Sequence, residues 1–185
     1  RLASGEILPA DVVVSNADAA WTYRYLLPKS ARRTWTDKRL DKARYSMSLF
    51  VWYFGTKGTK RMWPEVGHHS IVVGPRYRAH IREIFQTGKL SEDMSLYVHR
   101  PSVTDPTVAP NGGDTFYALS PVPHLGHADP VDWATEAEPY RQRVLKVLED
   151  QLLPDLSSHL SASLVFTPLD FRDRYLSPYG AGFSI

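Results

Sequence analysis

Histidines in two groups are the first candidates for chemistry in this sequence. His68 and His69 are adjacent, and a second group lies in a loop stiffened by prolines: His124, His127, Asp129 and Asp132. Imidazole and carboxylate side chains are zinc ligands. Adjacent residues of a strand point to opposite faces, however, so we expect His68 and His69 not to share an ion. The second group is more typical of a structural turn or of a lid that faces a ligand, and we predict no metal site.

Motifs for nucleophilic catalysis and phosphate binding are not found. The sequence holds no cysteine, which excludes disulfides, thiolate catalysis and cysteine-ligated metals. It contains no Gly-x-Ser-x-Gly nucleophile elbow and no glycine-rich phosphate loop. The residues therefore identify no catalytic side chain, and the chain by itself predicts no self-sufficient active site.

Composition and charge are those of an ordinary globular protein. Of the 185 residues, 43% are hydrophobic and 23% are charged, and the formal net charge of +2 is too small to indicate a nucleic-acid partner. The longest apolar run, Leu49–Phe54, is far shorter than the roughly 20 residues of a membrane-spanning helix. The first residues show no signal-peptide pattern. We therefore expect a cytoplasmic protein without a transmembrane segment.

Hydrophobic patterning predicts strands that alternate with helices. Runs rich in β-branched and aromatic residues predict strands at residues 10–15, 46–54, 70–73, 96–99, 115–120 and 163–166. Apolar residues at helical spacing predict four helices. The first follows a cap at Asn16 or Asp18, and the others lie at 77–85 before Gly88, at 133–152 before Pro154, and at 156–160. This order predicts an α/β (α+β) fold in which helices flank a mixed, largely antiparallel sheet.

Two further features are compatible with a bound ligand. Aromatic residues make up 12% of the chain, and they can form a core, line an apolar cavity or lie at a membrane interface. Near the end of the sequence, Gly180 and Gly182 would let the backbone approach a ligand closely. For any single aromatic residue, a place in the core is the simplest expectation.

Seven short segments follow one another in a specific order across nearly the whole chain. They are residues 10–18 (ADVVVSNAD), 48–55 (SLFVWYFG), 74–78 (GPRYR), 93–99 (DMSLYVH), 103–105 (VTD), 118–126 (ALSPVPHLG) and 166–173 (FTPLDFRD). Each is weak alone. In this order and spacing, they make the chain resemble the bacterial-type phytoene desaturase family, the FAD-dependent carotenoid desaturases.

The resemblance implies a fold and a division into parts. Such enzymes resemble flavin monoamine oxidase and protoporphyrinogen oxidase, in which a substrate domain is inserted into an FAD-binding Rossmann-like domain. The family's N-terminal Gly-x-Gly-x-x-Gly and its C-terminal glycine-rich FAD segment do not occur here, so we expect a central fragment of a longer protein. Residues 1–18 would be a remnant of the FAD-binding domain, 19–166 the substrate-binding domain, and 167–185 the return segment towards the FAD domain.

The resemblance also implies roles for individual residues. Those expected near FAD are Asn16, Ala17, Gly180 and Gly182. Those expected to line the substrate cavity are Trp52, Phe54, Tyr97, Tyr117, Thr167, Pro168 and Phe171. Structural alternatives stay open for two of these positions, because Asn16 could cap a helix and Thr167-Pro168 could end a strand.

The implied activity is the introduction of double bonds into phytoene or a related C40 carotenoid, with FAD as the electron acceptor. The full-length enzyme is expected to touch the membrane peripherally, because its substrate dissolves only in lipid. The fragment alone is expected to be inactive and to bind FAD poorly. Two alternatives stay open: another flavin oxidoreductase, such as a carotenoid isomerase or ketolase, and a non-catalytic module that binds an apolar ligand. The oligomeric state is not predicted.

Overall fold

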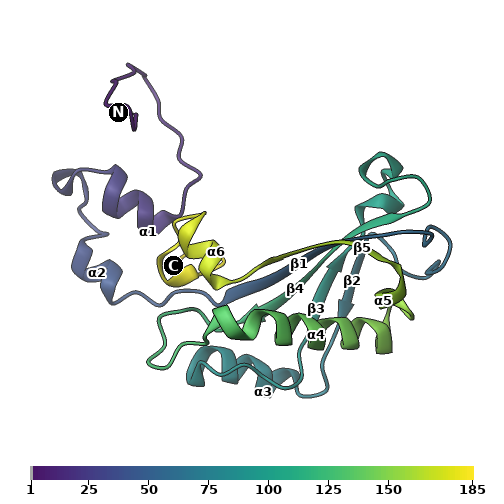
Figure 1. Ribbon diagram of the computed structural model, residues 1–185. Helices are drawn as coiled ribbons and strands as arrows, with labels where there is room; N and C mark the ends of the chain where they lie inside the picture. Colours follow the sequence, from purple (N-terminus) through teal and green to yellow (C-terminus); the bar gives the residue numbers. More distant parts are fainter. Residues whose placement is uncertain (1) are drawn as a thin grey trace.

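The centre of the molecule is an antiparallel sheet. The computed structural model describes residues 2–185, and within them five strands form one sheet in the order β2-β3-β4-β1-β5 (Figure 1). Every neighbouring pair in this sheet is antiparallel. The strands are β1 (Ser48–Thr56), β2 (His69–Val72), β3 (Leu96–His99), β4 (Asp114–Val122) and β5 (Leu160–Phe166). The predicted α+β class with a largely antiparallel sheet is confirmed.

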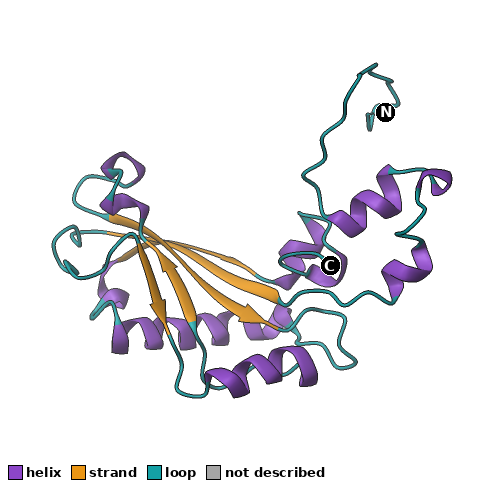
Figure 2. Ribbon diagram, turned by 180° about the vertical axis from the view of Figure 1, so that it is seen from behind, coloured by secondary structure: helices purple, strands orange, loops and turns teal. Residues whose placement is uncertain are grey.

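Two of the α-helices cover one side of this sheet. The α-helices are α1 (Ala19–Trp21), α2 (Asp37–Asp41), α3 (Tyr77–Arg82), α4 (Trp133–Gln151), α5 (Leu156–His159) and α6 (Pro168–Asp173). Single π turns extend α1 over Thr22–Leu26 and α3 over Glu83–Thr87. Figure 2 shows α3 and α4 on the same side of the sheet, whereas the opposite side is crossed by no helix of residues 2–185. No helix in this described part is long and apolar enough to cross a membrane.

The core lies between the sheet and α4. Alternation along β1 turns Phe50, Trp52 and Phe54 to the covered side, where each is at most 3% exposed. The ring of Phe50 packs edge-on against Tyr140 of α4 at 4.8 Å between centroids. Pro154 follows the end of α4, as the sequence predicts, and the residue before a proline is disfavoured in the helical conformation; a second proline, Pro139, lies inside the helix.

A buried ion pair joins β4 to the end of β3. Arg100 makes a bidentate pair with Asp114, with N–O distances of 3.0 and 2.9 Å, and both side chains are at most 5% exposed. Arg100 also donates to the backbone oxygens of Trp63 and Val66. Hydroxyl groups of Thr59 and Ser102 complete the hydrogen bonds to the carboxylate. The pair therefore fixes the loop between β1 and β2 as well as the strand ends.

The predicted strand at residues 10–15 is not formed in this structure. Leu2 to Glu6 form a turn, and the valines after it, Val12, Val13 and Val14, have 78–88% of their surface exposed. A strand needs a neighbouring backbone to accept and donate its hydrogen bonds, and no segment of residues 2–185 lies paired with this run. The helix cap that was predicted at Asn16 or Asp18 is Asp18. Its Oδ1 accepts from the backbone N of Trp21 and caps α1.

Candidate functional site

A layer of aromatic rings covers the open side of the sheet. We define the aromatic face as six residues from β3, β4, β1, β5 and the α6 region: Tyr97, Tyr117, Tyr53, Phe166, Phe171 and Tyr175. Tyr117 lies 5.7 Å from both Tyr97 and Tyr53, measured between ring centroids. Tyr53 lies 5.6 Å from Phe166. Beyond Phe166, Tyr175 and then Phe171 continue the series at 6.4 and 5.6 Å. The rings thus form one continuous apolar surface.

Strand register explains why these rings meet. Tyr53 is paired directly with Tyr117 across β1 and β4, and with Leu164 across β1 and β5. Opposed side chains of neighbouring strands point to the same face. Tyr97 joins from β3, because its partner in β4, Leu119, is two residues from Tyr117 and therefore on that same face.

The structure separates the four strand aromatics that were predicted to share a cavity wall. Tyr97 and Tyr117 lie on the aromatic face, but Trp52 and Phe54 lie on the opposite face, in the core against α4. Side chains alternate along a strand, so the residue of β1 that joins the aromatic face is Tyr53. Sequence reasoning missed Tyr53, although period-two alternation from Trp52 and Phe54 was a signal for it.

Two hydroxyl groups of this face, those of Tyr117 and Tyr53, have raised pKa values. Burial, together with the neighbouring Tyr97, raises the pKa of Tyr117 to about 12. Burial also raises the pKa of Tyr53. A cation lies at one end, because the Arg174 guanidinium is 4.9 Å from the centre of the Phe166 ring. Such a surface suits an apolar, flat ligand, and it carries no carboxylate for acid–base catalysis.

Thr167 and Pro168 hold the C-terminal helix next to this face. The Thr167 hydroxyl accepts from the backbone N of Leu169, and the Asp170 carboxylate accepts from the backbone N of Thr167, which together form a capping box. Thr167 is only 7% exposed, and β5 ends at the residue before it. Both residues therefore end a strand and start α6, the helix that carries Phe171.

The four residues predicted near FAD fall into two pairs. Asn16 and Ala17 are exposed, in the segment before α1. Gly180 and Gly182 instead pack closely against this chain: a Cβ on Gly180 would lie 2.2 Å from the oxygen of Pro168, and one on Gly182 would lie 2.8 Å from Leu49. Contacts within the chain account for both glycines, whereas Asn16 and Ala17 are exposed.

Gly180→Ala is expected to destabilise the protein by about 2–3 kcal/mol, because the residue has φ of +66° and its new Cβ would meet the Pro168 oxygen. Gly58→Ala is the matched control, since Gly58 has φ of +71° with open space around it, and it should cost about 1 kcal/mol. Denaturant unfolding of both variants measures the difference. Equal losses would show that the close approach at Gly180 is unimportant.

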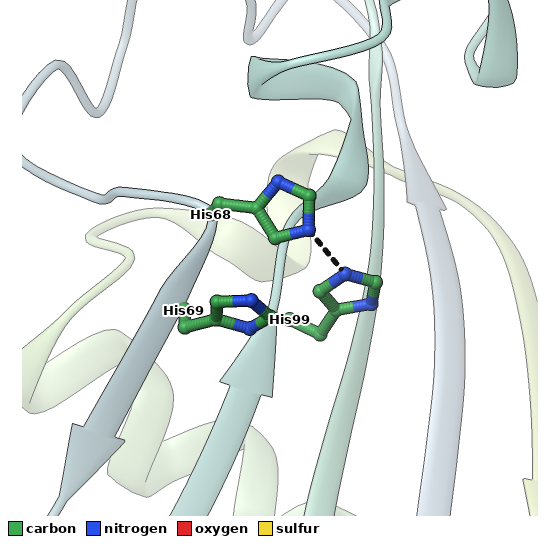
Figure 3. A group of neighbouring side chains, drawn as sticks. All are labelled: His68, His69 and His99. Carbon is green, nitrogen blue, oxygen red and sulfur yellow. Dashed lines mark hydrogen bonds between the residues drawn. The ribbon is translucent and has the colours of Figure 1, made fainter.

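His68 and His69 were expected to point to opposite faces of a strand, and the structure shows otherwise. His68 precedes β2, so strand alternation does not separate it from His69, and the two rings lie 4.4 Å apart. His99 of β3 completes the group, with its Nε2 2.7 Å from the Nε2 of His68 (Figure 3). Burial, together with the two neighbouring imidazoles, lowers the pKa of His99. Sequence reasoning missed His99, because strand pairing alone brings it to His68, 31 positions away.

The second histidine group forms a turn. His124 and His127 stack at 4.6 Å, and the backbone N of Gly126 donates to Nδ1 of His124. Tyr179 lies 5.9 Å from His124, so this loop contacts the C-terminal segment. The structure therefore shows a turn here, which is one of the two alternatives that the sequence left open.

Comparison with known proteins shows similarity along the whole chain. It is 66% identical over 185 residues to a phytoene desaturase (neurosporene-forming) of Cereibacter sphaeroides, and 64% identical to the corresponding protein of Rhodobacter capsulatus. It is 46% identical to a phytoene desaturase (lycopene-forming) of a Paracoccus species. Each alignment covers 100% of this chain but only 35–36% of the relative. No protein-family model matches the sequence. The resemblance inferred from the seven segments is confirmed.

Proposed function

We propose that this chain, which is similar over its whole length to bacterial phytoene desaturases, forms the substrate side of an FAD-dependent carotenoid desaturase. The chain spans about 35% of the length of the relatives it matches, so the activity proposed is that of the full-length protein. That protein would introduce double bonds into phytoene or a related C40 polyene. The observation that carries the proposal is the aromatic face, in a chain 64–66% identical to proteins named for phytoene desaturation.

The aromatic face would form one wall of the polyene cavity. A polyene is apolar and flat, and aromatic rings can contact it along its length, with the Arg174 guanidinium only at the Phe166 end of the wall. Phe166 and Phe171 continue this wall towards the C-terminal segment. In this proposal Trp52 and Phe54 support the wall from behind, because they fill the core under β1.

We also propose a division of the chain into three parts. Residues 19–166 would be the substrate-binding domain, residues 1–18 would complete the FAD-binding domain, and residues 167–185 would lead back to it. The exposed valines at 12–14 support the second assignment, since an apolar run of this kind is typical of a strand that is buried once a neighbouring strand pairs with it. Asn16 and Ala17 would then lie near the cofactor.

FAD, when bound, would supply the electron acceptor for removal of hydrogen from a CH–CH unit. The part of this chain would be to hold the polyene in a fixed pose and to exclude water from it. Because such a substrate dissolves only in lipid, we also propose that the full-length enzyme touches the membrane peripherally.

Expression of the full-length protein in a host that accumulates phytoene tests this function. We expect products with additional conjugated double bonds, detected by absorbance and mass after chromatography. An isomer of unchanged mass, or a ketone, would instead favour another flavin oxidoreductase. Unchanged phytoene, with the protein folded and loaded with FAD, would contradict the proposal.

A further inference from the structure

The three histidines at the edge of the sheet form a compact set of metal ligands. One nitrogen can be chosen from each of His68, His69 and His99 so that all lie within 4.8 Å of one another. Nitrogens bound to one tetrahedral zinc ion are about 3.3 Å apart, since each Zn–N bond is about 2.0–2.1 Å. The His68 and His99 Nε2 atoms, now 2.7 Å apart, would need to separate only slightly. The other separations, at most 4.8 Å, would need to shorten by up to about 1.5 Å, which small rotations of the side chains can supply.

The positions of these side chains are determined by the fold. His69 and His99 are directly paired in the register of β2 and β3, so they share a face. The backbone N of Arg100 donates to the oxygen of His68, which holds that residue beside the strand end. Arg100 itself is neutralised by Asp114, so the neighbouring buried pair carries no net charge that would repel a cation.

Two hydroxyl groups orient the imidazoles. Thr104 Oγ1 lies 2.6 Å from Nδ1 of His68, and the Tyr97 hydroxyl lies 2.6 Å from Nδ1 of His69. In metal sites, a hydrogen bond to one ring nitrogen typically sets the tautomer and directs the other nitrogen to the ion. Here it leaves Nε2 of both rings as the available ligand.

We propose that His68, His69 and His99 bind one divalent transition-metal ion, with zinc as the reference metal. Neutral imidazoles without a carboxylate favour Zn²⁺, Ni²⁺ or Cu²⁺ over the oxygen-seeking Mg²⁺ and Ca²⁺. The ion would tie the short edge strand β2 to β3. His99 lies beside the aromatic face, 4.8 Å from Tyr117 between ring centroids, but the test does not depend on the proposed desaturase activity, because it measures metal binding directly.

Titration calorimetry of metal-free full-length protein with Zn²⁺ tests the site. We expect saturable binding with a dissociation constant on the order of 1 µM or below, no comparable binding of Mg²⁺, and a Zn²⁺-dependent rise in melting temperature. His68→Gln and His99→Gln should each remove one equivalent of this binding. Thr104→Val should weaken it by about 10- to 100-fold. His159→Gln, which alters a histidine outside the group, should leave it unchanged.

Far-UV circular dichroism checks that the variants fold. Should His99→Gln fail to fold, His69→Gln makes the same test, because His69 is exposed at the start of β2. Absence of saturable Zn²⁺ binding to the natural protein would overturn the proposal and would leave the His68–His99 contact as a hydrogen bond between two imidazoles. Binding that survives all the His68, His69 and His99 substitutions would overturn it as well.

Discussion

Asp114→Ala is expected to lower the free energy of unfolding by about 3–5 kcal/mol, which is the range for breaking one side of a buried ion pair. The variant would leave the Arg100 guanidinium, 5% exposed, without its bidentate partner. It would also remove the acceptor for Thr59 and Ser102. Denaturant unfolding at neutral pH measures the loss.

The exposed pair of Glu138 with Arg141 on α4 is the control. Glu138→Gln should cost less than about 1 kcal/mol, because the Glu138 side chain is 63% exposed and solvent screens the pair. If Asp114→Ala cost no more than Glu138→Gln, the buried pair would not be a main determinant of stability.

Asp114 also predicts a dependence of stability on pH. Burial opposes its charge, but hydrogen bonds from Arg100, Thr59 and Ser102 outweigh burial and leave its pKa below the ordinary value. A depressed pKa in the folded state means that the pair stabilises the protein fully above the unfolded pKa of about 4. That contribution is lost as pH falls through the lower folded pKa. Asp114→Ala should therefore flatten the acid limb of the stability curve.

Most elements of this fold follow from local sequence signals. The strand at 96–99 was predicted with its observed bounds, and the long helix before Pro154 was predicted to within a residue. The strand at 10–15 was predicted from its apolar run, yet it is exposed here, because a strand also needs a partner that local composition does not provide.

The candidate site was harder to predict, because it depends on which strands are neighbours. Tyr53 and Tyr117 are far apart in sequence and meet only through the pairing of β1 with β4. His99 reaches His69 only through the pairing of β2 with β3. Resemblance to a family identified the aromatic segments, but the choice between Trp52 and Tyr53 required knowing which side of β1 the helix α4 covers.

Trp52 and Tyr53 give the sharpest test of this assignment, because they are adjacent and face opposite sides of β1. Trp52→Ala should cost about 3–5 kcal/mol of stability, since the ring is completely buried and its Nε1 donates to Ser163. Tyr53→Thr should cost about 1 kcal/mol or less, because Tyr53 is 39% exposed and threonine also favours strands.

The effects on activity should be the reverse of those on stability, with the larger loss at Tyr53. If the aromatic face holds the polyene, Tyr53→Thr should reduce desaturation by the full-length protein about tenfold, the equivalent of losing roughly 1.4 kcal/mol of contact with the ligand. A Trp52→Phe variant that still folds should retain most of its activity, because phenylalanine fills much of the same core volume without altering the aromatic face. If activity were lost in the Trp52 variant but not in the Tyr53 variant, with both proteins folded, the polyene would lie on the side of the sheet that α4 covers. That result would contradict the proposal. The pair therefore tests the position of the ligand independently of the stability of the domain.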